Sequence, residues 1–112
     1  MTPRELRLYC TADGACPFER WLAGLRDQTA RARIRARLDR LSLGNAGDRV
    51  ALGGGLSELR LHFGPGYRLY YAVIKHDKLL LLWGGNKRTQ ARDIPRAKAF
   101  LHDFRQRDHG NE

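Results

Sequence analysis

The stretch that decides the fold runs from Leu56 to Thr89 and reads LSELRLHFGPGYRLYYAVIKHDKLLLLWGGNKRT. Successive side chains of a strand point to opposite faces, so Leu59 and Leu61 can enter a core while Arg60 faces away from it. The Gly64-Pro-Gly segment is typical of a tight reversal between two antiparallel strands. A third apolar run, Lys78 to Trp83, completes a predicted three-strand meander.

The residues opposite the apolar ones form a set that we call the platform. Its members share one face of the meander or follow its last strand: Glu58, Arg60, His62, Arg68, Tyr70, Lys87, Arg88 and Gln90. Several are cationic and one is aromatic, a combination suited to phosphates and bases. The sequence therefore indicates RNA as a partner of this face.

Composition limits the class of protein before any motif is considered. The chain has 112 residues, 21 Lys and Arg against 12 Asp and Glu, and a formal net charge of +9. This length predicts one domain over residues 1–112, with a core over about 4–104 and a polar tail over 106–112. The basic excess is shared by both halves of the chain and favours polyanionic partners.

The two cysteines, Cys10 and Cys16, match neither a redox Cys-x-x-Cys pair nor a four-ligand zinc set, so we expect them to be reduced. No apolar run is long enough for a membrane span, and residues 1–5 lack the apolar segment of a signal peptide. We therefore expect a cytoplasmic protein with no membrane partner.

Patterns outside the meander predict an α+β fold. Residues 4–9 alternate as a short strand with Leu6 and Leu8 inward, and Pro17 begins a first amphipathic helix. Residues 29–43 form a second helix whose Arg33 and Arg37 are candidate RNA contacts, although arginines often only solvate a helix flank. Residues 45–55 are expected to be a loop, residues 89–93 a turn, and Pro95 the start of a final helix. The predicted sheet is antiparallel, has about four strands and carries helices on one face.

The platform suggests phosphodiester chemistry without a metal or other cofactor. No Asp and His cluster has metal-ligand spacing, so the ribose 2′-hydroxyl is the available nucleophile. Arg60 and Arg68 would stabilise charge on the phosphate, and Lys87 would act as a stabilising cation or as a base. Glu58 and His62 are competing bases. Tyr70 would stack on a base, with Arg88 and Gln90 as further RNA contacts.

Several motifs together resemble one known family. They are Phe18-Glu-Arg-Trp-Leu, the arginine-rich run from Arg31, Gly44-Asn-Ala-Gly-Asp, Ser57-Glu-Leu-Arg, Gly64-Pro-Gly-Tyr-Arg-Leu-Tyr-Tyr and Leu82-Trp-Gly-Gly-Asn-Lys. The chain resembles the RelE/ParE toxin superfamily over residues 4–104, specifically the HigB-like addiction module killer proteins, also called phage Gp49-like. By position, Arg68 matches the phosphate-stabilising arginine of that family, Arg60 lies near its lysines, and Lys87-Arg88 match its basic pair.

The resemblance implies a RelE-like fold and the role of toxin in a type II toxin–antitoxin module. Such a toxin is neutralised by a small antitoxin, often a helix-turn-helix protein from the adjacent gene. RelE and HigB relatives are ribosome-dependent mRNA interferases, whereas ParE relatives inhibit DNA gyrase. Many members carry an aromatic residue where this chain has Ile94, which keeps the gyrase-inhibitor alternative open. A plain RNA-binding phage accessory domain is the third possibility.

Overall fold

The computed structural model describes residues 3–109, with side chains described to residue 107. The described elements, in chain order, are β1 (Glu5–Leu8), α1 (Pro17–Ala23), α2 (Gln28–Ser42), β2 (Arg49–Gly53), β3 (Leu56–Arg60), β4 (Tyr67–Lys75), β5 (Lys78–Asn86), the 3₁₀ helix η1 (Lys87–Thr89) and α3 (Gln90–His109). The strands form one mixed sheet in the order β1-β5-β4-β3-β2. β1 is parallel to β5, and the other pairs are antiparallel. The predicted α+β class and the meander are confirmed.

The strand that the sequence did not predict is β2, so the described sheet has five strands instead of about four. β2 pairs with β3 through a hairpin whose turn contains Gly53, Gly54 and Gly55, each with φ between 63° and 90°. These left-handed conformations suit glycine, which lacks a Cβ. The expected loop over residues 45–55 was wrong because β2 is short and lies at the polar edge of the sheet.

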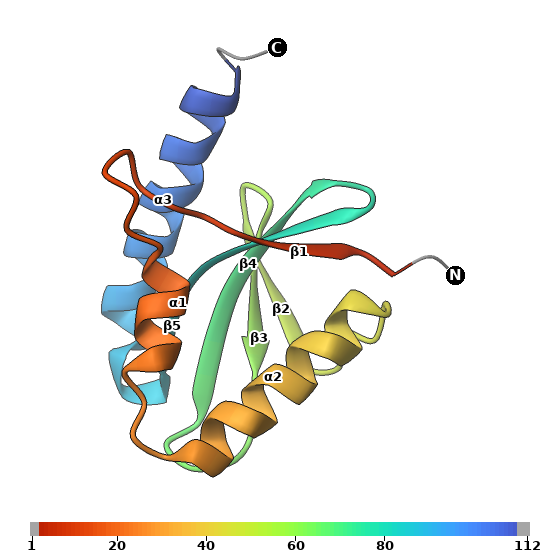
Figure 1. Cartoon of the computed structure of the whole chain (residues 1–112), viewed down its shortest axis with the longest axis vertical. Coiled ribbons are helices and arrows are strands. Elements are labelled where there is room, and N and C mark those ends of the chain that lie inside the picture. Colours follow the sequence, from red (N-terminus) through yellow and green to blue (C-terminus); the bar gives the residue numbers. More distant parts are fainter. Residues whose placement is uncertain (1–2, 110–112) are drawn as a thin grey trace.

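Helices cover both faces of the sheet (Figure 1). On one face α1 and α2 bury Phe18, Ile34 and Leu38 against Leu59 and Leu69 of the strands. On the other face α3 closes a second core, which is made of Tyr9, Leu56, Tyr70, Ala72, Leu80, Leu82, Ala97 and Leu101. The prediction that all helices lie on one side was therefore wrong. Burial on both faces also explains the unbroken apolar run of β5.

Two adjacent glycines in β5 let the two helical layers approach the sheet closely. A Cβ on Gly84 would lie 2.1 Å from the Trp21 ring of α1, and a Cβ on Gly85 would lie 1.9 Å from Asp93 Oδ2 of α3. Because neighbouring strand residues point to opposite faces, each glycine serves one layer. The dipeptide thus fixes where both helices sit.

α3 begins five residues earlier than predicted and continues further. It spans Gln90–His109 with Pro95 inside, so the expected turn over residues 89–93 and the helix start at Pro95 were wrong. Pro95 lacks the N–H that would bond the carbonyl of Ala91. Side-chain bonds from Gln90 and Asp93 hold this first turn on the sheet. Residues 106–109 of the expected polar tail are helical, and residues 110–112 lie outside the described part.

At the N-terminal end, β1 is shorter than the predicted residues 4–9. Leu6 packs against the core formed with α1 and α2, as expected. Leu8 is 41% exposed instead of buried. Tyr9 takes the buried place on the α3 face and stacks on Phe100 at 5.1 Å between ring centroids.

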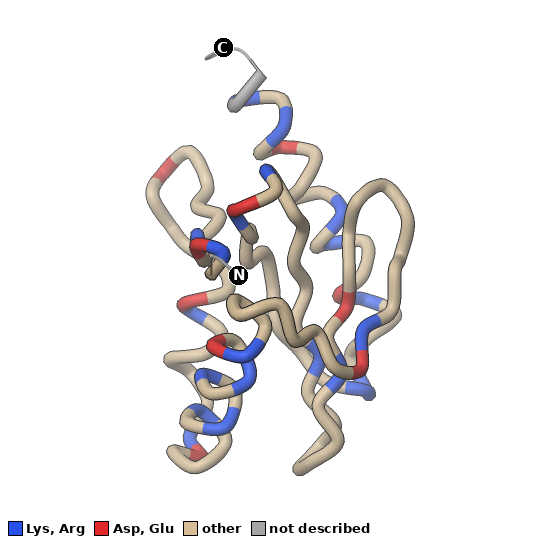
Figure 2. The backbone as a smooth tube through the Cα atoms, turned by 90° about the vertical axis from the view of Figure 1, so that its right-hand side faces the viewer, with Lys and Arg blue, Asp and Glu red and all other residues tan. Residues whose placement is uncertain are grey.

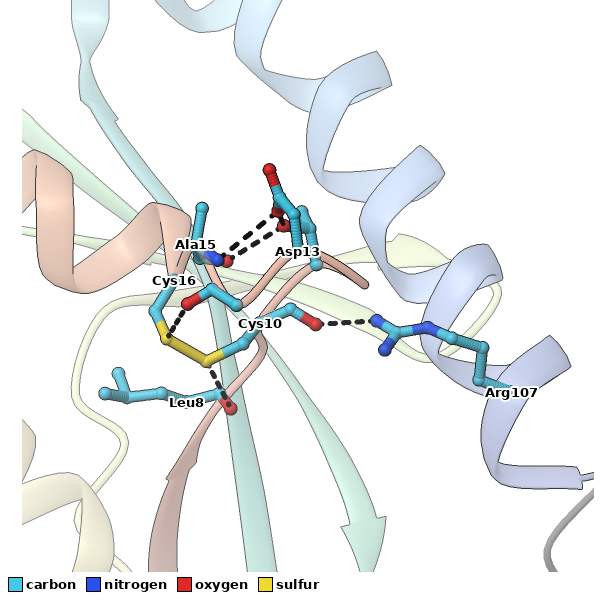
Figure 3. Close-up of a disulfide and its surroundings, with 8 residues drawn as sticks. Leu8, Cys10, Asp13, Ala15, Cys16 and Arg107 are labelled. Carbon is cyan, nitrogen blue, oxygen red and sulfur yellow. Dashed lines mark hydrogen bonds between the residues drawn. A yellow bond between two sulfur atoms is a disulfide. The ribbon is translucent and has the colours of Figure 1, made fainter.

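Cys10 and Cys16 form a disulfide, which corrects the expectation that they are reduced (Figure 3). The loop between them turns back on itself, since Thr11 N donates to the Ala15 carbonyl at 2.7 Å. This turn brings the two cysteine Cα atoms within 4.0 Å. The spacing argument considered redox and zinc motifs and overlooked a short structural loop. Arg107 Nη2 of α3 donates to the Cys10 carbonyl at 2.6 Å and ties the loop to the helix.

Candidate functional site

Three platform residues meet where β3 ends and β4 begins, on the face that α3 partly covers. Arg60 and Arg68 are directly opposed across the two strands. Like charges in that position destabilise a sheet, but the fully buried Glu58 lies between them. Arg60 Nε donates to Glu58 Oε1 at 2.9 Å, and Arg68 Nε lies 4.0 Å from the same oxygen. One carboxylate therefore neutralises two arginines.

The second oxygen of Glu58 joins the sheet to α3. Gln90 Nε2 donates to Glu58 Oε2 at 2.8 Å, so Gln90 is engaged in a structural bond. With both oxygens occupied and no exposed surface, Glu58 is placed to brace the arginines and not to accept a substrate proton. This geometry argues against its predicted role as a base.

Tyr70 is opposite Glu58 on β4 and is also fully buried. Burial, followed by the charge of Glu58, raises the pKa of Tyr70 far above its ordinary value. The phenol therefore stays protonated. A ring with no exposed surface cannot stack on an RNA base, so the expected stacking role of Tyr70 has no support in this geometry.

Gly66 brings Arg68 and Lys87 together beside this cluster. Arg68 is only 7% exposed, and its Nη1 donates to the carbonyls of Gly66 and Tyr67 at 3.2 and 3.3 Å. The backbone N of Lys87 donates to the Gly66 carbonyl at 2.9 Å. A Cβ on Gly66 would lie 3.4 Å from Lys87 Cβ and 3.5 Å from Arg68 Nη1. The bare glycine backbone thus lies between the Arg68 guanidinium and the first side-chain carbon of Lys87.

The turn after β5 presents Lys87 and Arg88 to solvent. Asn86 caps η1 because its side chain accepts bonds from the backbone N of Arg88 and Thr89 at 2.9 and 3.2 Å. Below this turn the buried Asp93 accepts bonds from Trp83 Nε1 at 2.9 Å and from the Thr89 hydroxyl. The two basic residues therefore project from a rigid base.

A groove of about 800 Å³ lies between α2 and residues 60–63. Its basic lining comes from both elements and consists of Arg33, Arg37, Arg40, Arg60 and His62. Arg60 thus belongs both to the cluster around Glu58 and to this groove. Lys and Arg positions are spread over the whole molecule (Figure 2), but the groove gathers five basic side chains into one hollow.

The groove residues differ in how firmly they are held. Arg37 is buried and donates to the carbonyls of Asn45, at 3.2 Å, and of Ala46. Burial lowers the pKa of Arg37, and the neighbouring Arg40 adds to the effect. Arg37 therefore holds the loop after α2 in place. Of the two arginines of α2 predicted to contact RNA, Arg37 is less accessible than Arg33. Arg33 lies over the Phe63 ring at 3.7 Å from its centroid.

His62 projects into the groove beyond the end of β3. It is exposed, and its Nε2 is hydrogen-bonded to the Asp48 carboxylate. A carboxylate on one imidazole nitrogen fixes the ring and its tautomer, an arrangement common for proton-transferring histidines. The sequence reasoning named His62 but missed Asp48, Arg40 and Phe63. Arg40 could have been found, because Arg33, Arg37 and Arg40 follow helical i, i+4, i+7 spacing.

Within residues 3–107, no three His, Cys, Asp or Glu side chains lie close enough together to hold a metal ion. Among the described helices, none has the length and apolar character needed to cross a membrane.

Fold and site together define a small basic α+β protein with a braced arginine pair and a cationic groove. No family model matches the chain. A Haemophilus influenzae protein described as uncharacterized is 43% identical over 87 residues, which cover 78% of this chain and 88% of the relative. The chain therefore belongs to the same family as this H. influenzae protein.

Proposed function

We propose that this protein is the toxin of a type II toxin–antitoxin module and acts in the cytoplasm as a metal-independent, ribosome-dependent mRNA interferase. The observation that carries the proposal is the grouping of Arg60, Arg68 and Lys87 around Glu58 and Gly66. The resemblance to RelE and HigB toxins supports the biological role. A small helix-turn-helix antitoxin is the proposed partner that neutralises it.

The proposed reaction uses the RNA as its own nucleophile. The 2′-hydroxyl loses its proton and its oxygen attacks the adjacent phosphorus, the bond from phosphorus to the 5′-oxygen breaks, and the 5′-oxygen takes up a proton from water. The products are a 2′,3′-cyclic phosphate and a free 5′-hydroxyl. Arg60 and Lys87, with Arg68 behind them, would stabilise the extra negative charge of the phosphorane. Guanidinium groups suit this role because they bind phosphate oxygens in pairs.

We assign the removal of the 2′ proton to His62. Glu58 is buried with both oxygens bonded, whereas His62 is exposed and held by Asp48. His62 also lies two residues from Arg60 along the chain and lines the same groove. Asp48 would orient the ring and stabilise the imidazolium that forms.

One observation favours the non-enzymatic alternative, a ParE-like inhibitor of DNA gyrase. Tyr70 is fully buried and Arg68 is 93% buried, so the platform has fewer side chains that can contact an RNA nucleotide than its sequence suggests. An inhibitor that acts by binding alone would not need these groups to reach a substrate.

Mapping mRNA 5′ ends by primer extension after a short induction distinguishes the two functions. Cells would express the wild type, Lys87→Ala or the control Lys75→Ala, since both lysines are exposed and only Lys87 belongs to the cluster. We expect translation-dependent cuts within codons for the wild type and Lys75→Ala, and a loss of at least 100-fold for Lys87→Ala. Growth arrest with intact mRNA in all three strains would reject the nuclease and favour gyrase.

A further inference from the structure

The groove beside α2 contains arginine side chains that have no acidic partner in the part of the chain that the structure describes. Within the described residues, the side chain of Arg40 forms no hydrogen bond or ion pair, and the side chain of Arg33 contacts the Phe63 ring. Asp48 is the single acid of the lining, and it is engaged by His62. Two exposed guanidinium groups thus face an open hollow without a counter-charge.

The spacing of these two arginines suits a chain of phosphates. Arg33 and Arg40 are seven residues apart on α2, which places them roughly 10 Å apart along the helix axis. Each guanidinium can bind one phosphate through two parallel hydrogen bonds. The Arg33 guanidinium already lies over the Phe63 ring, with Cζ 3.7 Å from the ring centroid, and this pair offers a surface on which a base can stack.

The lining favours a nucleic acid over an acidic protein segment. An amphipathic acidic helix needs apolar anchors as well as charge. The groove offers one such anchor, because Leu61 is 4% exposed and Phe63 is half-buried with Arg33 over its ring. A single RNA strand needs charge and a stacking surface, and both are present.

We propose that this groove is a binding site for single-stranded RNA, in which Arg33 and Arg40 hold two phosphates next to the segment that Arg60 engages. Arg60 lines both the groove and the cluster around Glu58, so one strand can pass from one to the other. This inference rests on the proposed function, since the strand is the mRNA that is to be cleaved. The groove then fixes the position of the RNA, and Arg60, Lys87 and His62 act on it.

The test measures binding separately from cleavage. A fluorescent 2′-O-methyl RNA, which cannot be cut, is titrated by anisotropy with the wild type, Arg33→Ala/Arg40→Ala and the control Arg35→Ala/Arg26→Ala. The control removes the same charge from exposed positions outside the groove. Losing two phosphate contacts should reduce the slope of log affinity against log salt by roughly 1.4 and weaken binding about 20-fold at 0.1 M salt. The control should lose less than threefold.

Equal losses in the groove variant and in the control would overturn the inference, because net charge alone would then explain binding. Polyglutamate with the same charge as the RNA serves as the competing ligand. If it binds the wild type more tightly than RNA does, and the groove variant fails to bind it, the occupant is an acidic protein instead. Cleavage of cellular mRNA is scored independently with Lys87→Ala. If the wild type cuts nothing while the groove variant still loses RNA, the proposed nuclease fails and the groove remains an RNA site.

Discussion

Replacing Glu58 by Gln tests whether one buried carboxylate holds the arginine pair together. The substitution keeps the shape but removes the charge that Arg60 contacts at 2.9 Å and that Arg68 faces at 4.0 Å. Breaking a fully buried ion pair costs about 3–5 kcal/mol. The Arg60 side chain is 34% exposed and regains some hydration, whereas the Arg68 side chain is 8% exposed and does not. We therefore expect a loss of about 2–3 kcal/mol in the free energy of unfolding, at or just below the lower end of that range, because Arg60 recovers part of its hydration.

The chain contains a matched control for this experiment. Glu5 also lies on a strand two residues before an arginine, and Arg7 Nε contacts its carboxylate at 2.7 Å, but both side chains are more than half exposed. Exposed pairs of this kind contribute about 0–1 kcal/mol. Urea denaturation should thus separate Glu58→Gln from Glu5→Gln, and the melting temperature of Glu58→Gln should fall by roughly 10 °C. Equal and small losses in the two variants would refute the bracing role of Glu58.

Three further outcomes follow from the packing and the bonds. Gly85→Ala should destabilise the fold by about 1–3 kcal/mol, because its Cβ would meet Asp93; chemical denaturation measures the loss, and no loss would contradict the close approach. Cys10→Ser should cost roughly 2 kcal/mol, the chain-entropy value for so short a disulfide loop, and thiol titration of the unreduced wild type should find no free thiol. Hydrogen bonds from Tyr9 and then from Arg107 lower the pKa of Asp103, so their stabilisation is present above the ordinary value of 3.8 and is lost as the pH falls through the lower folded value. Tyr9→Phe should flatten the loss of stability below pH 4, and an unchanged acid profile would exclude this contribution.

The sequence predicted what depends on periodicity. The two-residue alternation around Leu59 and Leu69 placed the right side chains in the first core, and the 3.6-residue spacing of Ile34 and Leu38 found α2. Prediction from the sequence failed where the exposure of a residue depends on contacts with residues distant in the chain. Whether the face with Tyr70 is open or covered depends on where α3 packs, and no local pattern specifies that.

The same limit applies to the candidate site. Alternation placed Glu58 and Arg60 on one face correctly, but it could not show that Gln90, 32 residues later, would close over the carboxylate. Nor could it show that Arg33 would meet Arg60 in one groove, since helix and strand come together only through tertiary packing. Residue types therefore suggested phosphate binding, while the structure separates exposed cations from those that brace the fold.

The close packing at Gly85 of β5 helps to explain why some of these cations are exposed and others are buried. Gly85 lies in the same row of the sheet as Arg60 and Arg68, and its missing side chain lets Asp93 sit against that row. Asp93 also accepts a bond from Trp83, which lies in the neighbouring row with Glu58 and Tyr70, so the first turn of α3 is held on both rows. Within this row Arg68, the neighbour of Gly85, is 7% exposed, whereas the side chain of Arg60, one strand further away, is 34% exposed. The buried carboxylate of Glu58 therefore neutralises one buried arginine, Arg68, and one that remains near solvent, Arg60. Close packing at Gly85 is thus a condition for a charged cluster at the sheet end, and loss of that packing should disorder the arginines before it unfolds the cores.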